Sequence, residues 1–502
     1  MSTFPHDLFA GQRFAVVGLG KNGLPAAQAL RAMGAEVTAW DDQPASRAAA
    51  QAAEIDLPLR DLREGAFAFD ALVLSPGIPH LLPTPHPIAQ RAREAGVPIL
   101  SDAELLFRAV RAAGSRARFV GITGTNGKST TTALLAHVLA EAGVPVAAGG
   151  NLGPAALSLP LLPHDGVYVL EMSSYMLERI ATMRFDAAAM LNLSADHLDR
   201  HGDMTGYARA KRAIFDRQTD ADLAVIGVDD ALSREMAAAL RAGPARVVRV
   251  SGVAQAAQSH AGPALDVSSW PSSTRPSLRQ GAAGDGRVEP GHDDGNADIH
   301  PVAGILQDAA GPLFRLADAQ ALPGAHNAQN AAAVAAMALF LGISRTDLAH
   351  GLATYPGLPH RQQLVATIDG VRFINDSKAT NADATERALV CYDRLVWIAG
   401  GMAKEGGIAP LVPLFPRIAR ALLIGRDAPV LAETLAANGV PHETVGTLEA
   451  AVPAAFAAAR TLAAHVVLLS PACASWDQFT GYDQRGDRFA DLARGLSSGR
   501  AA

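Results

Sequence analysis

The sequence predicts an α/β protein of three domains built on parallel sheets. Short apolar runs rich in β-branched residues alternate with helical patterns over most of the 502 residues, which is typical of α/β units. These runs lack polar alternation, so we expect helices to cover both faces of each sheet. The chain also restarts with a strand twice after a turn-rich link, near 113 and near 355. A chain of this length can form two to four domains, each with its own core.

The predicted elements follow a division into domains 1–112, 113–354 and 355–502. The first domain has strands at 13–17, 36–40 and 71–74. The second has strands at 118–122, 167–171, 188–193 and 223–226, and a helix at 128–142. The third has strands at 371–374, 395–398, 421–424 and 466–469. Between 251 and 300 the periodicity is lost and small and polar residues dominate, which predicts a mobile insertion that serves as a surface loop or a lid.

Composition excludes several classes of protein. A net charge of -6 gives no basic footprint for nucleic acid or an anionic membrane. Cys391 and Cys473 are the only cysteines, too few for a disulfide framework. The sequence shows no secretory signal and no apolar run long enough to span a bilayer. We therefore expect a cytoplasmic protein that binds small molecules, without membrane insertion.

A glycine-rich segment at 121–130, GITGTNGKST, is the strongest motif. It lies between a predicted strand and a predicted helix, where backbone amides can hold a phosphate. Lys128 can reach the β- and γ-phosphates, and Ser129 can coordinate Mg²⁺. Ile122 stands where the strict phosphate-loop pattern has glycine, so a chance glycine-rich turn stays an alternative. The predicted ATP contacts here are Gly124, Thr125, Asn126, Gly127, Lys128, Ser129 and Thr130.

Two later strand ends carry side chains suited to a metal. Glu171 ends the strand at 167–171, and His197 follows the strand at 188–193. Because the carboxyl ends of parallel strands share one edge, both can face the Mg²⁺ of the loop. Glu171 could instead cap a helix, and His197 could be a hydrogen-bonded structural residue.

The first domain carries a second glycine motif, Gly18-Leu-Gly-Lys-Asn-Gly23, with Asp41 at the end of the next strand. By itself this pattern is a dinucleotide fingerprint and suggests an NAD(P)-dependent oxidoreductase. The motif is common, however, and it does not explain the phosphate loop at 121–130. A non-catalytic nucleotide-binding module is a further alternative.

The variant phosphate loop resembles that of the Mur ligase family, and four further blocks match the same family. They are LSPGI at 74–78, NDSKATN at 375–381, GGMAK at 400–404 and SPACAS at 470–475. The resemblance covers all three domains and leaves out only the insertion. It implies a Rossmann-like domain for a UDP-linked substrate, a central ATPase-like domain with the phosphate loop, and a C-terminal Rossmann-like domain for the incoming amino acid.

The resemblance also implies a metal set and a substrate pocket. Mg²⁺ would be held by Ser129, Glu171, His197 and a carbamylated Lys211, since a carbamate offers the oxygens that Mg²⁺ prefers. Without the family, Lys211 would be an ordinary surface lysine. The UDP-substrate contacts would be Gly20, Lys21, Asn22, Asp41, Ser75, Gly77, Asn151 and Ser174. Gln43 replaces a basic residue of some members, and Asn151 could simply be a turn residue.

The remaining residues concern the nucleotide and the amino acid. The family pattern assigns Asn327, Asn330, Arg361, Asp376 and Lys378 to ATP. From the residues alone, Asn327 could be a helix cap and Arg361 a surface charge. In glutamate-adding members, the matching amino-acid contacts are Thr380, Lys404, Ser475, Trp476 and Tyr482. Met176, Trp476 and Tyr482 depart from the residues usual in the family, which concerns the shape of the pocket more than its charge.

The reaction that the resemblance implies is an ATP- and Mg²⁺-dependent ligation in peptidoglycan precursor synthesis. ATP would activate the carboxylate of UDP-N-acetylmuramoyl-L-alanine as an acyl phosphate, and D-glutamate would attack it. The small molecules are then its partners, and we expect a monomer. A Mur-type ligase for a different amino acid is the nearest alternative.

Overall fold

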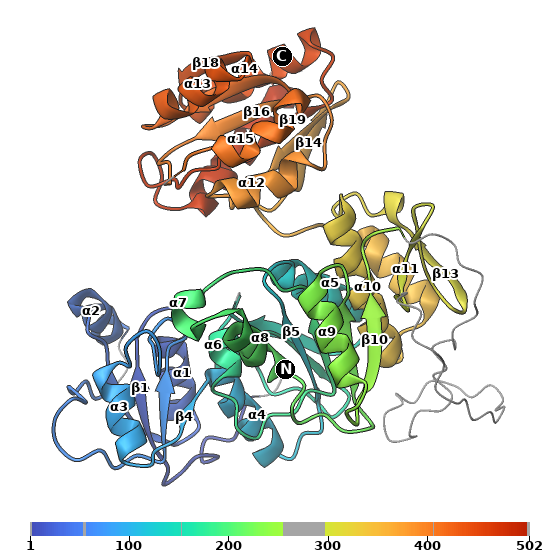
Figure 1. Cartoon of the computed structure of the whole chain (residues 1–502). Coiled ribbons are helices and arrows are strands. Elements are labelled where there is room, and N and C mark those ends of the chain that lie inside the picture. The colour runs from blue at the N-terminus through green and yellow to red at the C-terminus, as the bar shows by residue number, and fades with distance from the viewer. Residues whose placement is uncertain (1–2, 54–56, 152, 255–296, 405, 499–502) are drawn as a thin grey trace. The chain divides into compact units, whose positions relative to one another are not determined.

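The computed structural model describes residues 3–53, 57–151, 153–254, 297–404 and 406–498. The chain forms two compact units (Figure 1). Unit 1 comprises Met1–Asp318 and Ala325–Thr354, and unit 2 comprises Ala319–Gly324 and Tyr355–Ala502. The expected boundary near 113 lies inside unit 1, where two separate sheets adjoin, and it stays a prediction.

The first sheet of unit 1 is parallel and has the strand order β2-β1-β3-β4. Its strands are β1 (Arg13–Val17), β2 (Glu36–Trp40), β3 (Ala71–Leu74) and β4 (Ile99–Leu100). Its helices are α1 (Gly23–Ala32), α2 (Pro44–Ala52), α3 (Pro87–Glu94) and α4 (Asp102–Ala112). The chain leaves β1 toward β2 and then returns to the other side as β3. This reversal makes the carboxyl ends of β1 and β3 a switch point, where ligands bind in open α/β sheets.

The second sheet of unit 1 is also parallel, in the order β10-β9-β8-β5-β7-β6. Its strands are β5 (Arg118–Thr123), β6 (Val146–Gly150), β7 (Val167–Glu171), β8 (Ala187–Met190), β9 (Leu223–Gly227) and β10 (Arg246–Val250). Its helical elements are α5 (Lys128–Glu141), η1 (Ala156–Ser158), α6 (Ser174–Leu177), α7 (Leu198–His201), α8 (Met204–Arg212), α9 (Ala231–Leu240), α10 (Ala325–Phe340) and α11 (Arg345–Thr354). Since β5 lies between β7 and β8, the ends of all three strands converge beside the phosphate loop.

A small antiparallel sheet accompanies the second sheet, with β11 (His300–Val302), β12 (Ile305–Asp308) and β13 (Gly311–Arg315), followed by η4 (Leu316–Asp318). Most of the predicted insertion at 251–300 lies outside the described residues. Its two ends were assigned wrongly, because Ser251 is buried and its amide donates to the carbonyl of Ile299, which is itself buried.

Unit 2 holds one sheet in the order β14-β15-β19-β16-β17-β18. Its strands are β14 (Gln363–Ile368), β15 (Val371–Asn375), β16 (Leu395–Gly400), β17 (Ile418–Ile424), β18 (His442–Gly446) and β19 (Val466–Leu469). Only β14 runs antiparallel among these strands. Its helical elements are α12 (Ala382–Leu389), η5 (Ala409–Arg417), α13 (Ala428–Ala437), α14 (Leu448–Thr461) and α15 (Tyr482–Ser498). Two apolar clusters cover the two faces of this sheet.

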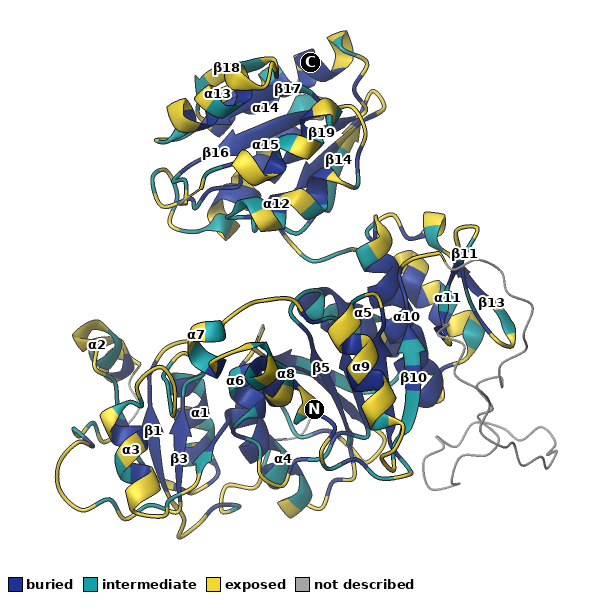
Figure 2. Cartoon of the chain, in the orientation of Figure 1, coloured by how far each residue is buried: buried dark blue, intermediate teal, exposed yellow. Residues whose placement is uncertain are grey.

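The prediction of an α/β protein with parallel sheets is confirmed. Each predicted strand is present, although β8 ends at Met190 instead of residue 193. Figure 2 shows the strands as buried and the outer faces of helices such as α3 and α9 as exposed, the pattern expected of sheets covered on both faces. No helix in the described part of the chain combines the length and the apolar character that crossing a bilayer requires.

Candidate functional site

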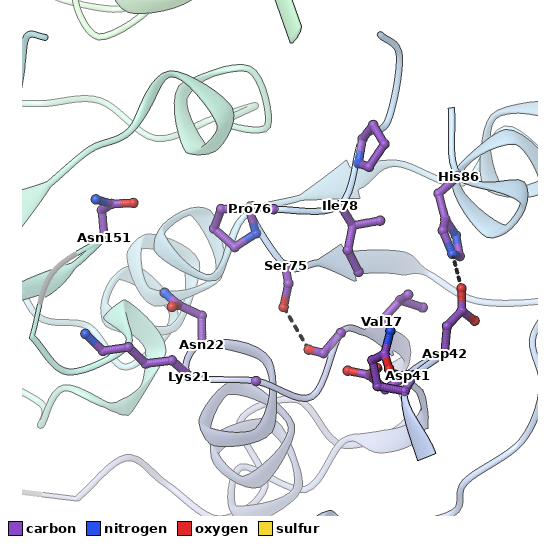
Figure 3. Close-up of a pocket in the computed structure, with 15 residues that line it drawn as sticks. Val17, Lys21, Asn22, Asp41, Asp42, Ser75, Pro76, Ile78, His86 and Asn151 are labelled. Carbon is purple, nitrogen blue, oxygen red and sulfur yellow. Dashed lines mark hydrogen bonds and ion pairs between the residues drawn. The ribbon is translucent and has the colours of Figure 1, made fainter. Parts of the chain in front are cut away.

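A pocket of ≈ 500 Å³ opens at the switch point between β1 and β3 (Figure 3). Its walls come from the ends of β1 and β3, the start of α1, and Asn151 after β6. Every residue predicted to contact the UDP-substrate lines it, except Ser174. The lining residues are Val17, Gly18, Gly20, Lys21, Asn22, Asp41, Asp42, Gln43, Ser75, Pro76, Gly77, Ile78, Pro79, His86 and Asn151.

Hydrogen bonds from two predicted residues fix the shape of this pocket. The hydroxyl of Ser75 donates to the carbonyl of Gly18 over 2.7 Å, which joins the loops after β1 and β3. The carboxylate of Asp41 accepts the amides of Leu19 (2.6 Å) and Gln43 (2.8 Å). One Asp41 oxygen therefore holds the glycine loop, and the other holds the turn after β2.

Asp42 and His86 also line the pocket, and sequence reasoning missed both. Figure 3 shows His86 and Asp42 joined by a hydrogen bond, with Nε2 2.9 Å from Oδ2. Because the Nδ1 atom of His86 accepts the amide of Ile88, Nε2 carries the proton and donates to Asp42. This bond lowers the pKa of Asp42 below its ordinary value. The sequence did carry one signal for His86, namely its position directly before Pro87, because proline often occupies the first position of a helix.

Asn151 connects the pocket with the end of β7. Its amide nitrogen donates to Oε1 of Glu171 over 2.8 Å. Ser174, in contrast, lies outside the pocket lining. It is buried, and its hydroxyl lies 2.9 Å from Nε2 of His201, whose Nδ1 lies 3.1 Å from Glu178. A contact of Ser174 with the UDP-substrate stays a prediction.

The phosphate loop lies between β5 and α5, as its sequence predicts. Gly127 precedes the helix with φ +84°, and a Cβ atom there would lie 2.4 Å from Oδ1 of Asn330, so both the backbone angle and the packing require glycine. Asn330 in turn donates to Oδ1 of Asn327 over 3.0 Å. The two asparagines predicted for ATP thus pack against the loop. Ser129 and Thr130 are buried in the first turn of α5.

A chain of amide side chains, which the sequence analysis missed, holds the phosphate loop in place. The Oδ1 atom of Asn192 accepts the amide of Asn126 over 2.9 Å, and its carbonyl accepts the amide of Thr125. Asn192 also donates to Gln329, which donates to Asp229. Asn192 lies at a predicted strand end, but nothing in the sequence pairs it with Gln329 of α10.

Two lysine ammonium groups converge on one carbonyl of this loop. Lys128 donates from Nζ to the carbonyls of Gly124 and Thr125, both over 2.8 Å. Lys211, only 2% exposed, donates to the same Gly124 carbonyl over 2.9 Å. Burial, followed by the charge of Lys128, lowers the pKa of Lys211 well below its ordinary value. A neutral amine is the form that combines with CO₂, and carbamylation of Lys211 stays a prediction.

The residues around the loop fit a divalent cation. Glu171 is 2% exposed, and its Oε2 atom finds no hydrogen-bond partner among the described residues. A buried carboxylate oxygen without a partner is costly unless a cation or water meets it. No group of three or more His, Cys, Asp or Glu side chains suited to a metal occurs in the described ranges. The predicted set includes only Glu171 and His197 of these types.

His197 occupies a strained backbone position at the start of α7. Its φ of +53° lies in the left-handed region, which non-glycine residues rarely adopt. Its side chain is 49% exposed, lies 3.4 Å from Asp196, and is tilted against the ring of Tyr175. A metal contact by His197 stays a prediction.

In unit 2, the loops after β15, β16 and β19 come together at one edge of the sheet, since these strands are parallel neighbours. The first loop carries Asp376, which is buried and accepts the hydroxyl of Ser470 over 2.7 Å and the amide of Gln362 over 3.2 Å. Burial raises the pKa of Asp376 to about 7. The same loop carries Lys378, whose Nζ lies 5.5 Å from the ring centre of Tyr482.

The other predicted amino-acid contacts lie on the same edge. Met402 and Ala474 pair as an antiparallel bridge, which joins the loop of Lys404 to that of Ser475. Lys404 is exposed, Ser475 is buried and Thr380 is half-buried. Trp476 is 68% exposed, an unusual value for this side chain.

Arg361 lies on a loop with a strained backbone. Both of its neighbours, His360 (φ +61°) and Gln362 (φ +44°), adopt left-handed angles. The Nδ1 atom of His360 lies 3.2 Å from the amide nitrogen of Asn375, and the backbone of Gln362 contacts Asp376. The loop is thus held firmly on both sides of Arg361.

The chain combines a phosphate loop, a pocket at a switch point and a cluster of polar loops in unit 2. Comparison with known protein families identifies the class of enzyme that has these features. The family model described as Mur ligase middle domain matches residues 122–281, and the one described as Mur ligase, glutamate ligase domain matches residues 360–473. The chain belongs to the Mur ligase family and is an ATP-dependent ligase of peptidoglycan precursors. The glycine motif of the first domain therefore does not indicate an oxidoreductase.

Two relatives and one solved structure describe this membership in more detail. A UDP-N-acetylmuramoylalanine–D-glutamate ligase of Paramagnetospirillum magneticum is 47% identical over 498 residues, covering 99% of both chains. One of Rhizobium meliloti is 45% identical and covers 97% of this chain and 96% of its own. The fold is similar to that of UDP-N-acetylmuramate-alanine ligase MurC from Thermotoga maritima, with a TM-score of 0.54 at 16% identity, covering 97% of this chain and 99% of that one.

Proposed function

We propose that this protein joins D-glutamate to UDP-N-acetylmuramoyl-L-alanine through an acyl phosphate. The observation that carries the proposal is the phosphate loop, where Lys128 and Lys211 meet at one carbonyl beside the unpartnered oxygen of Glu171. The Lys128 ammonium suits the triphosphate, and a carbamate at Lys211 together with the Glu171 oxygen that lacks a partner among the described residues suits the divalent cation that arrives with it. The names of the full-length relatives support the two substrates.

In the proposed reaction, the alanyl carboxylate attacks the γ-phosphorus of ATP and releases ADP. Lys128 and the loop amides stabilise the charge that spreads over the transferred phosphoryl group. Mg²⁺, when bound by Ser129, Glu171, His197 and carbamylated Lys211, supplies further charge neutralisation. Arg361, Asp376, Lys378, Asn327 and Asn330 complete the proposed nucleotide contacts.

The second step forms the amide bond. The amine nitrogen of D-glutamate attacks the acyl carbon, the bond from that carbon to the phosphate oxygen breaks, inorganic phosphate leaves, and the nitrogen loses a proton. Lys404 would offset the charge of the glutamate carboxylates, and Ser475 and Thr380 would donate directional hydrogen bonds. Excluding water protects the acyl phosphate from hydrolysis. We further propose that the enzyme acts as a monomer in the cytoplasm.

An ADP-release screen tests the proposal directly. Purified protein with Mg·ATP would receive UDP-muramoyl acceptors together with L-alanine, D-glutamate, lysine or diaminopimelate. We expect ADP release with UDP-N-acetylmuramoyl-L-alanine and D-glutamate, and loss of at least about 10²-fold in kcat for Lys128→Ala. ADP release with another amino acid in place of D-glutamate would contradict D-glutamate as the substrate. If no amino acid led to ADP release, the protein would be a non-catalytic nucleotide-binding module.

Full activity of Lys128→Ala would contradict the role of the phosphate loop. The control is binding of the UDP-substrate to the same variant. This binding should be retained, because the pocket between β1 and β3 does not include Lys128.

A further inference from the structure

Arg485, on α15, connects the three loops of unit 2 that carry the proposed amino-acid contacts. Its Nε atom donates to the hydroxyl of Ser377 over 2.9 Å, and one terminal nitrogen donates to the carbonyl of the same residue over 2.9 Å. The other terminal nitrogen donates to the carbonyls of Cys473 (3.1 Å) and Gly400 (3.4 Å). One planar guanidinium thus binds the loop of Thr380, the loop of Lys404 and the loop of Ser475.

The guanidinium is a buried charge whose acceptors are all neutral. Arg485 is 1% exposed, and within the described ranges no carboxylate lies at ion-pair distance from it. Its hydrogen-bond acceptors are one hydroxyl and three backbone carbonyls. Burial lowers its pKa to about 10, so it stays charged at neutral pH. A buried charge whose direct acceptors are all neutral is costly.

The backbone around the guanidinium is adapted to this contact. Gly401 has φ +128°, and a Cβ atom there would lie 2.2 Å from the carbonyl of Ala474 and 3.3 Å from a terminal nitrogen of Arg485. Glycine at this position therefore lets the Lys404 loop lie against both the guanidinium and the Ser475 loop. The bridge between Met402 and Ala474 holds the same two loops together.

We propose that Arg485 is a positioning residue for the amino-acid substrate, fixing the spacing of the Thr380, Lys404 and Ser475 loops and placing a buried positive charge beneath the substrate's carboxylates. This inference rests on the proposed function, since it assumes that these loops hold an anionic amino acid. Arg485 acts through the loops, because its donors are already bonded to the protein. Its fork geometry matters, because an ammonium cannot bond three loops in one plane.

Steady-state kinetics of Arg485→Met and Arg485→Lys test the proposal. We expect the KM for D-glutamate to rise at least about 30-fold in Arg485→Met and by a smaller factor in Arg485→Lys, which keeps the charge. The KM for ATP should rise by a smaller factor than that for D-glutamate, because the Ser377 loop also carries Asp376 and Lys378, and the KM for the UDP-substrate should change by less than about 3-fold. The matched control is Arg488→Met, because Arg488 lies on the same helix but is exposed and paired with Glu449. It should leave every KM unchanged.

A second variant covers the case in which Arg485→Met does not fold. Ser377→Ala removes the hydroxyl that accepts from Nε and donates to the carbonyl of Tyr482, while it keeps the guanidinium, and it should raise the KM for D-glutamate by roughly 3- to 10-fold and that for ATP by a smaller factor. Equal rises for ATP and D-glutamate, or a lower melting temperature with unchanged KM values, would overturn the proposal. A wild-type enzyme that does not use D-glutamate would instead overturn the proposed function, so the two failures are distinguishable.

Discussion

At the scale of single residues, the site depends on charged side chains buried against backbone carbonyls. Arg179 and Arg485 are each about 2% exposed or less, and each donates to carbonyls of a loop that borders a proposed substrate site. A buried cation that binds carbonyls costs more than an ion pair would, but it fixes several backbone segments at once. We infer that these charges serve the geometry of the loops more than the stability of the fold.

Lys404 is the residue whose replacement separates the amino-acid site from the nucleotide site. It is exposed, so Lys404→Ala should not alter the fold. Loss of a charge-assisted contact should raise the KM for D-glutamate at least about 10-fold and leave the KM for ATP unchanged. The KM for D-glutamate of Lys404→Arg, which keeps the charge, should lie between the value of the unmodified protein and that of Lys404→Ala. Equal effects on both substrates in kinetic assays would argue against a carboxylate contact.

Asp376 gives a prediction about pH. Burial raises the pKa of the Asp376 carboxyl in the folded protein from its ordinary value of 3.8 to about 7. The folded protein therefore holds this proton more tightly than the unfolded chain, and the free energy of unfolding should fall as the pH rises from about 4 to about 7. Denaturant titrations of Asp376→Asn should show a weaker decline across this window. If the free energy of unfolding fell equally with pH in both proteins, the raised pKa of Asp376 would be refuted.

At the scale of helices and strands, the sequence predicted the central strands of the parallel sheets and, of their edge strands, only β2. Strands such as β7 and β16 are buried along their whole length, so their apolar runs are unbroken. The strands β14 and β18 are partly exposed at the edges of their sheet, and their polar residues hide the pattern. Edge strands need no second covered face, so their composition gives little signal.

Motif residues of the site could be predicted, whereas the residues that support them could not. The phosphate loop and the glycine loop are contiguous, so spacing alone places their members together. Arg485 contacts residues 377, 400 and 473, and Asn192 contacts Gln329. Only the order of strands and helices in the folded unit brings such distant positions into contact. One sequence cannot reveal these pairs.

Arg179 gives a prediction about the loop that follows β3. It follows α6 and donates to the carbonyls of Leu74 (2.7 Å), Ser75 (3.1 Å) and Ile78 (2.6 Å), so it holds the loop that lines the switch-point pocket. Arg179→Met should raise the KM for the UDP-substrate roughly 10-fold, a loss of about 1.4 kcal/mol. The KM for D-glutamate should not change.

Arg184→Met serves as the control for Arg179, because the Arg184 side chain is 43% exposed and forms two long ion pairs, with Asp186 (3.8 Å) and with the buried Asp222 (3.7 Å), and none of these residues lines the switch-point pocket. It should leave the KM for the UDP-substrate unchanged. If the two variants lowered activity equally, the loop contact of Arg179 would have no special role in substrate binding.

At the scale of the whole molecule, the two units have separate hydrophobic cores. Buried apolar residues of unit 1 run from Phe9 through the first two sheets to Leu352 of α11, and the two clusters on the faces of the unit 2 sheet contain only residues from 364 onward. Separate cores can unfold independently. Calorimetry should therefore resolve two transitions, and the UDP-substrate should raise the midpoint of only one of them. A single transition that shifts as a whole would show that the units unfold cooperatively.

The exposure of Trp476 has a practical consequence for following the reaction. An indole surrounded by water emits at longer wavelengths than one enclosed by protein, and Trp397 of the same unit is fully buried. If an amino acid binding beside Ser475 shields Trp476 from solvent, the emission should move toward shorter wavelengths as the site fills, and Trp476→Phe should abolish the signal. The protein would then contain its own optical probe of substrate arrival, which separates binding from turnover without any added label.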